Sequence, residues 1–176
     1  RARGWGAVAV IAATVTCVYL ATLALGRMLR VPHATVVLTA TGTAICGAAA
    51  VAGMSAVVRS DGEDDDVEDA AATAIASVTL FGTLMIVALP LLVEALGLAG
   101  RGAGVWVGAS VHEVGQVVAA GGLISAGVLD AAVLAKLGRV VLLAPLVAIV
   151  GVVEARRAER RARLAAERSE VGDVLA

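Results

Sequence analysis

Long apolar segments alternate with short charged stretches along the whole 176-residue chain. Five segments have the length of a helix that crosses a bilayer core of roughly 30 Å, for which about 20 apolar residues suffice. Their approximate bounds are 5–25, 34–58, 70–98, 104–122 and 137–153. A mixed linker, 123–137, precedes the last of them. The pattern predicts an all-α membrane protein with about five transmembrane or re-entrant helices.

The third apolar segment needs a closer look because it is longer than a simple span. It contains Pro90 and a single charge, Glu94. A helix of this length either tilts in the bilayer or gives way to an interfacial turn after the proline. The sequence leaves both alternatives open.

Charged residues gather outside the apolar segments. Of the 29 charged side chains (14 basic plus 15 acidic), seven fall in 61–69, within an acidic loop, 59–69, and ten in 154–170, within a charged tail that runs to 176. Hydrophobic residues make up 60% of the chain, against roughly 45–50% in soluble domains. This composition excludes a soluble enzyme. Arg and Glu alternate in the tail and the net charge is −1, so nothing indicates nucleic-acid binding.

The distribution of arginines predicts the orientation. If all five segments cross, the tail shares a side with Arg27, Arg30 and Arg101, and that side carries nine basic residues against at most five. The positive-inside rule then places the tail in the cytoplasm and the acidic loop outside. The use of Arg almost to the exclusion of Lys is typical of a GC-rich genome and favours a bacterial inner membrane. A re-entrant second or fourth segment would change this topology.

The second segment has an unusual centre, residues 39–47, with three Thr and two Gly. Such residues suit a helix that unwinds around a small polar ligand, where free N–H groups and a half-helix N-terminus favour an anion. Close packing of a small-residue face through Gly42 and Cys46 explains the same composition equally well. For the broken-helix hypothesis, the candidate binding residues are Thr41, Gly42, Thr43 and Gly47.

The fourth segment contains a second polar group of residues within apolar surroundings: Ser110, His112, Glu113 and Gln116. Ionisable groups inside a membrane are costly and point to function, here substrate coordination or proton relay. On a continuous helix His112 and Gln116 would share a face. The alternative is a solvated interfacial segment. A zinc-protease signature fails, because Gln116 replaces the second His, and no metal or cofactor site is predicted.

Two further cations, Lys136 and Arg139, stand where the linker meets the fifth segment. Their long side chains either reach the membrane interface or line a path for an anion. We favour the interface, because Lys and Arg near the end of a span commonly extend their charge into the headgroup region.

Three strings carry a family resemblance: TGTAICG at 41–47, AIASVTLFGT at 74–83, and WVGASVHEVGQVVAAG at 106–121, the last followed by KLGRVVLLAP at 136–145. In this order and spacing they resemble the YeiH-type sulfate exporter family of bacterial multi-pass inner-membrane proteins. The resemblance covers about 29–151. It implies a ten-span fold with inverted repeats and broken helices, distantly similar to cation:proton antiporters and bile-acid symporters.

The resemblance further implies export of sulfate or a related small inorganic or organosulfur anion by alternating access, together with a coupling proton or cation. Family members continue with several more spans after the part that matches 136–151, so we expect this chain to be a fragment or a truncated relative. The alternative function is a non-transporting membrane scaffold or subunit that requires a partner chain. An enzyme is not expected, because no nucleophile–base set can be assembled. Homo-oligomerisation is left open.

Overall fold

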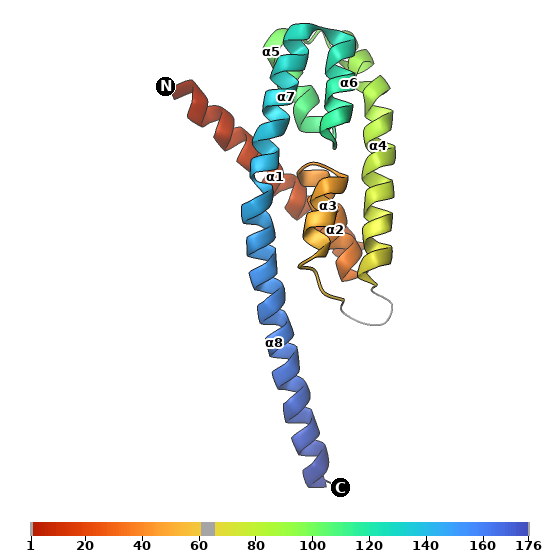
Figure 1. Cartoon of the computed structure of the whole chain (residues 1–176), viewed down its shortest axis with the longest axis vertical. Helices are drawn as coiled ribbons and strands as arrows, with labels where there is room; N and C mark the ends of the chain where they lie inside the picture. The colour runs from red at the N-terminus through yellow and green to blue at the C-terminus, as the bar shows by residue number, and fades with distance from the viewer. Residues whose placement is uncertain (1, 61–65, 176) are drawn as a thin grey trace.

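The described part of the chain is entirely helical and contains no strand (Figure 1). The computed structural model describes the backbone of residues 2–60 and 66–175, and the side chains of 9–60 and 66–166. The helices are α1 (Ala2–Met28), α2 (His33–Ala44), α3 (Ala48–Ser55), α4 (Val67–Ala95), α5 (Gly100–Ser110), α6 (Val114–Ile124), α7 (Ala126–Val141) and α8 (Leu143–Leu175). The prediction of an all-α membrane protein is confirmed.

Three helical stretches are long and apolar enough to cross a bilayer: 9–28 in α1, 67–95 in α4, and 126–166, where α7 continues into α8. The 29 residues of α4 make a helix of about 43 Å, which must tilt to fit a core of about 30 Å. Its N-cap is Asp66, which accepts hydrogen bonds from the N–H groups of Glu68 and Asp69. α4 continues through Pro90 to Ala95 with no turn directly after the proline, which favours the tilted span.

Two pairs of short helices lie between these spans. With 12 and 8 residues, α2 and α3 are about 18 Å and 12 Å long, and neither can span a bilayer. The start of α2 and the residues after α3 both lie beside α8. His33 contacts Glu154 of α8, and Val58 and Arg59 line a cavity with the same residue. The pair therefore enters and leaves at the same end of the molecule (Figure 1). We call it the first hairpin, and the end where the charged part of α8 emerges the tail side.

The second pair, α5 and α6, forms a second hairpin at the opposite end (Figure 1). Each helix has 11 residues. Gly104, near the start of α5, lies against Val128 and Ala131, and Gly121, near the end of α6, lies against Leu129. Both outer ends of the hairpin thus pack on the first turns of α7. The second hairpin enters the molecule from the far side and returns to it.

The two hairpins are the re-entrant form that the sequence had left open beside a crossing. Segments 34–58 and 104–122 do not cross as single helices, because each is interrupted near its middle and turns back. The stretch 123–137 is not a linker: most of it belongs to α7. An apolar run of about 20 residues has the same composition whether it crosses once or forms two half-length helices, and therefore the run length alone did not distinguish them.

The hairpins also change the predicted topology. Residues 61–65 of the acidic loop lie outside the described part, but its flanks, Ser60 and Val67, line a cavity with Glu154 on the tail side. The loop was wrongly predicted to lie opposite the tail. Arg101 was wrongly assigned to the tail side, because it follows the full crossing by α4. Among described side chains, the tail side carries Arg27, Arg30, Arg59, Arg156, Arg157, Arg160, Arg161 and Arg163.

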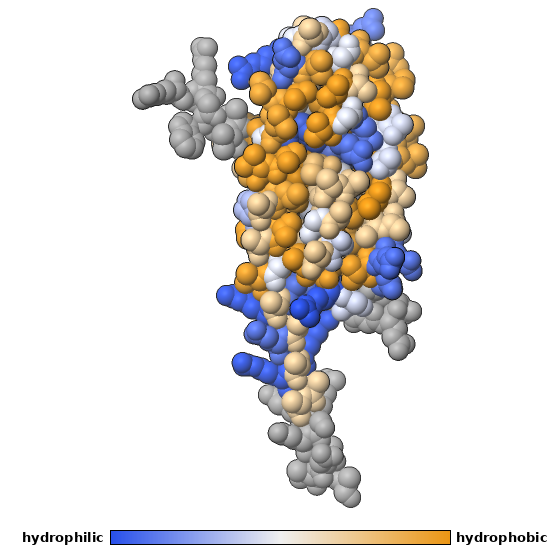
Figure 2. Space-filling model, viewed as in Figure 1, coloured by the Kyte–Doolittle hydropathy of each residue, from blue (hydrophilic) through white to orange (hydrophobic). Residues whose placement is uncertain are grey.

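The interior consists of apolar clusters that attach each hairpin to a span. Leu38, Val51 and Met54 of the first hairpin pack with Ala70 and Ala74 of α4. Val107 and Val117 of the second hairpin pack with Leu89 of α4 and Val128 of α7. Outward-facing Leu, Phe and Val side chains form an apolar surface above the charged part of α8 (Figure 2). Lipid can solvate this surface, since the lipid tails are as apolar as these side chains.

Close packing of α5 on α7 gives a first prediction. A Cβ atom at Gly108 would overlap the carbonyl oxygen of Ala132, whereas one at Gly102 on the same helix meets nothing within 4 Å. Gly108→Ala should therefore destabilise the protein by about 1–3 kcal/mol, while Gly102→Ala should stabilise it by up to about 1 kcal/mol through helix propensity. Thermal unfolding in detergent compares them, and equal melting temperatures would refute the packing.

Candidate functional site: the crossing of two broken helices

The first hairpin turns back at 45–47, near the middle of the molecule. α2 ends as the N–H of Ile45 donates to the carbonyl of Thr41 (3.0 Å), and the N–H of Gly47 reaches back to Gly42 (2.9 Å). Gly47 has φ 72° and ψ −133°, a conformation that essentially only glycine adopts without strain. The sequence predicts this break through the Thr and Gly residues of 39–47, although not the change of direction that follows it.

The second hairpin turns back at 111–113. α5 ends as the N–H of Val111 donates to Val107 (3.1 Å), and α6 starts after Glu113. The N–H of Glu113 donates to Oε1 of Gln116 (3.2 Å), so Gln116 closes the first turn of α6. Because α5 ends at Ser110, His112 is not helical, and the predicted shared helix face of His112 and Gln116 is wrong.

Lys136 of α7 joins the two breaks. Its Nζ atom donates to the carbonyl of Ile45 (2.8 Å) and to the carbonyl of Val111 (2.7 Å). The side chain is fully buried, with 0% exposed. One ammonium group thus binds both tips, which is possible only because the hairpins meet at the level of Lys136. We call this meeting point, residues 45–47, 111–113 and Lys136, the crossing.

Arg139, one turn further along α7, repeats the arrangement on the ends of the two incoming helices. Its guanidinium donates to the carbonyls of Thr43 and Ala44 at the end of α2, each at 2.9 Å, and to the carbonyl of Ala109 at the end of α5. The side chain is 2% exposed. The guanidinium fork therefore satisfies acceptors from both hairpins at once.

These contacts correct the prediction that Lys136 and Arg139 extend to the interface. The last carbonyls of α2 and α5 have no partner within their own helices and carry the negative ends of the helix dipoles. In a membrane no water is available to bind them, and the two cations take that place. The signal that could have found this arrangement is their i, i+3 spacing, which on a continuous α7 puts both on one face.

Glu113 provides a third contact between the hairpins. Its side chain lies so close to Gly47 that a Cβ atom there would come within 2.5 Å of Cγ. Its Oε1 atom accepts a hydrogen bond from the Thr79 hydroxyl of α4 at 3.2 Å. Gly47 is thus required both for its backbone conformation and for the approach of this carboxylate.

Gln116 attaches the second hairpin to α4. Its Nε2 atom donates to the carbonyl of Thr79 (3.2 Å) and to the hydroxyl of Thr83 (3.4 Å), and the amide lies directly over Gly82. Thr79 and Thr83 were not singled out from the sequence as site residues. Their i, i+4 spacing within an otherwise apolar helix is the pattern that marks them.

The remaining predicted residues differ in what they offer a ligand. Thr41 is fully buried and its hydroxyl donates to Val37 of its own helix (2.8 Å). Gly42 packs closely against Val51 and Val78, so close packing and the broken helix occur together. Thr43, Ser110 and His112 are half-buried, and Nδ1 of His112 is buried without a hydrogen-bond partner. These three side chains lie at or beside the crossing.

Among the described residues no group of three or more His, Cys, Asp and Glu side chains is placed to hold a metal ion. The charged groups at the crossing are two cations, Lys136 and Arg139, and one carboxylate, Glu113. The described side chains here thus include one more cation than carboxylates, and both cations donate to backbone carbonyls at the ends of the incoming helices.

The fold and the crossing define a helical membrane protein in which two re-entrant hairpins meet between helices long enough to span a bilayer. Sequence comparison places the chain more closely: residues 2–169 match the family model described as Conserved hypothetical protein 698, and the chain belongs to that family. Its relatives are UPF0324 membrane proteins of many bacteria. No solved structure matches the chain.

The relatives are considerably longer than this chain. A UPF0324 membrane protein of Corynebacterium glutamicum is 46% identical over 147 residues, which cover 84% of this chain and 41% of the relative. One from Brucella suis is 34% identical over 153 residues, covering 87% and 43%. One from Pasteurella multocida is 41% identical over 135 residues, covering 75% and 38%. The chain thus spans about two fifths of the length of the relatives it matches.

The crossing yields a second prediction, on stability. Gly47→Ala combines a strained backbone with an overlap on the Glu113 side chain, whereas a Cβ atom at Gly115, next to the other break, meets nothing within 4 Å. The first substitution should lower the free energy of unfolding by about 2 kcal/mol or more. Gly115→Ala should change it by less than about 1 kcal/mol. Thermal unfolding of the two variants side by side tests this, and a harmless Gly47→Ala would contradict the described geometry.

Proposed function

We propose that this chain is part of a secondary transporter, not an enzyme, that moves a small anion across the bacterial inner membrane by alternating access. The observation that carries the proposal is the hydrogen bonding of one buried ammonium group, that of Lys136, to both hairpin tips. Broken helices that meet near the midplane are the arrangement in which transporters bind small ions.

An anion is the class of substrate that the charges at the crossing favour. Lys136 uses two of its three N–H groups on carbonyls, which leaves a third for a ligand. The N-termini of α3 and α6 follow the two breaks and carry the positive ends of their dipoles. Thr43, Ser110 and His112 supply further donors. Gly42 and Gly47 allow the break, Thr41 and Gln116 hold the tips, and Glu113 is the candidate for proton relay.

The two hairpins give alternating access a simple form. The first hairpin leads from the tail side to the crossing and the second leads there from the far side. Moving one hairpin away from α7 opens the crossing to one side only, while the other hairpin keeps the opposite side closed. Either movement breaks carbonyl contacts to Lys136 and Arg139. An anion that accepts hydrogen bonds from these two side chains replaces the lost contacts and so lowers the free-energy cost of moving a hairpin.

Sulfate or a related inorganic or organosulfur anion is the proposed substrate. This choice rests on the similarity of the strings at 41–47 and 106–121 to YeiH-type sulfate exporters, since the matched relatives are named only as membrane proteins. The proposal includes a ten-span inverted-repeat architecture, because the relatives are more than twice as long. The arginines on the tail side support a cytoplasmic location for that side, by the positive-inside rule.

Transport in proteoliposomes tests the proposal. The full-length protein that contains this chain should exchange radiolabelled sulfate, or an organosulfonate, across the membrane. Lys136→Met should reduce exchange at least tenfold, because it removes the charge and both carbonyl contacts. Leu137→Met, with the same new residue at an exposed neighbouring position, should retain it. Thr43→Val and His112→Ala should weaken exchange while the protein remains folded.

Two results would refute the proposal in different ways. If Lys136→Met, Thr43→Val and His112→Ala all exchange sulfate like the wild type, the crossing is not the binding site. If no small anion is exchanged and the wild type co-purifies with a second membrane protein, the chain is instead a scaffold or subunit of that partner. Chromatographic mass measurement of the same sample shows whether the protein is a homo-oligomer.

A further inference from the structure

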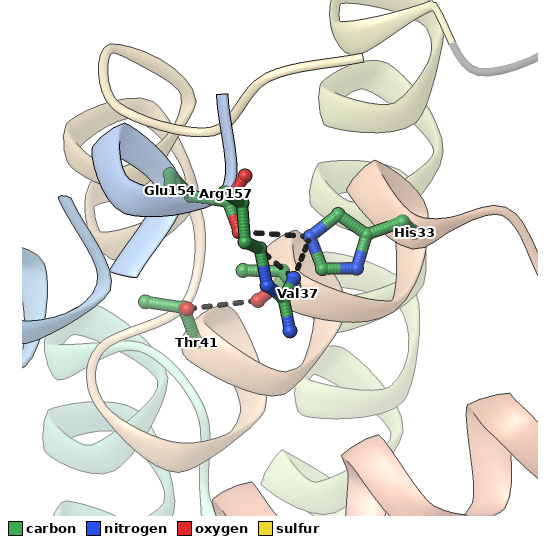
Figure 3. Close-up of polar contacts among 5 residues, drawn as sticks. All are labelled: His33, Val37, Thr41, Glu154 and Arg157. Carbon is green, nitrogen blue, oxygen red and sulfur yellow. Dashed lines mark hydrogen bonds and ion pairs between the residues drawn. The ribbon is translucent and has the colours of Figure 1, made fainter. Parts of the chain in front are cut away.

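A second polar cluster lies at the tail-side end of the first hairpin, away from the crossing (Figure 3). His33 opens α2, and Glu154 and Arg157 lie one turn apart on α8. Nε2 of His33 is 3.0 Å from Oε1 of Glu154 and 3.0 Å from a terminal nitrogen of Arg157, and that nitrogen is 3.1 Å from the same Glu154 oxygen. Three atoms from two elements therefore form a closed triangle.

The triangle contains a conflict over one proton. The guanidinium of Arg157 can only donate, so its contact requires Nε2 of His33 to carry no hydrogen. The ionised Glu154 carboxylate can only accept, so its contact requires Nε2 to carry one. Both hydrogen bonds cannot exist at once. The imidazole can bond only one of the two at a time: with its hydrogen on Nδ1 alone it accepts from Arg157, and once Nε2 carries a hydrogen, as it must in the protonated ring, it donates to Glu154.

The surroundings allow a proton to reach the cluster. Glu154 is 4% exposed and the His33 side chain 16%, whereas the Arg157 side chain is 42% exposed and free to swing outward. A cavity of about 460 Å³ opens beside Glu154 and Arg157. The other titratable or charged groups around the two adjoining cavities are Tyr19 and Arg27 of α1, Arg59 after α3, and Arg161 of α8.

We propose that His33, Glu154 and Arg157 form a proton-binding site that changes how the first hairpin is attached to α8. When His33 is neutral and carries its hydrogen on Nδ1, Arg157 donates to both the imidazole and the carboxylate and lies between α2 and α8. When a proton binds His33, Nε2 donates directly to Glu154, and the like charge drives Arg157 toward solvent. No other atom is transferred, and the proton comes from water on the tail side.

The position of the site gives this proton a role in transport, and in that respect the inference rests on the proposed function. α2 runs from His33 to the crossing, and α8 continues from α7, which carries Lys136 and Arg139. The cluster thus connects the outer end of the first hairpin to the element that holds its tip. Proton binding exchanges an Arg-bridged attachment for a direct ion pair and so alters the hairpin movement that alternating access requires.

Nitrogen-15 NMR of the full-length protein, with labelled histidine, tests the proton site without any transport. This chain has two histidines, and the signal that disappears from the spectrum of the full-length protein in His33→Gln is assigned to His33. At high pH Nε2 of His33 should be unprotonated, and on acidification it should gain a hydrogen. Glu154→Gln should move the midpoint of this titration down, and Arg157→Gln should move it up, each by about one pH unit or more, because they remove an opposite and a like charge.

Arg163→Gln, on the exposed face of the same helix, is the matched control and should leave the midpoint in place. The proposal is overturned if Nε2 of His33 keeps its hydrogen at every pH, or if neither Glu154→Gln nor Arg157→Gln moves the midpoint further than Arg163→Gln does. The transport arm is separate: His33→Gln should flatten the pH profile of anion exchange without abolishing it. If the His33 midpoint moves as expected in both variants but the protein exchanges no anion, the proton site stands and only the proposed transport function is contradicted.

Discussion

Lys136 and Arg139 make it possible for two broken helices to lie inside a membrane. Each interruption leaves carbonyl groups without partners, and an unpaired backbone group in hydrocarbon costs several kcal/mol. The five carbonyls concerned belong to Thr43, Ala44, Ile45, Ala109 and Val111. Two side chains on one face of α7 satisfy all five. The cost of burying these cations is in turn offset by the helix dipoles that converge on them.

Several other features follow from this arrangement. Both tips must reach the same level of α7, so each hairpin is about half as long as a span. Glycine stands where the elements approach most closely: Gly47 under Glu113, Gly82 under Gln116, and Gly108 against α7. The polar side chains of Thr79 and Thr83 then face the second tip, and α4 attaches to both hairpins. The outward surface does not need glycines or polar side chains for close approach. It is apolar, as a surface in contact with lipid can be.

Much of this was accessible from the sequence. The helical class follows from hydropathy, and the two polar segments 39–47 and 110–116 do contain the breaks, since Thr, Gly and adjacent ionisable residues fit a continuous membrane helix poorly. The choice between a crossing and a re-entrant hairpin stayed open, because a crossing helix and two half-length helices contain the same apolar residues. The prediction of a linker at 123–137 was wrong, and with it the expectation that Lys136 and Arg139 lie at an interface. His33 and Glu154, 121 residues apart, have no local signature at all.

The central claim is that both hairpins turn back at the crossing instead of passing through the membrane. Single cysteines at Arg30, Ser60, Gly102 and Leu123, in a background with Cys17→Ser and Cys46→Ala, test this with a membrane-impermeant thiol reagent applied to sealed vesicles of known orientation. The account predicts that positions 30 and 60 are labelled from one side and positions 102 and 123 from the other. Labelling of 30 and 60 from opposite sides, or of 102 and 123 from opposite sides, would contradict it.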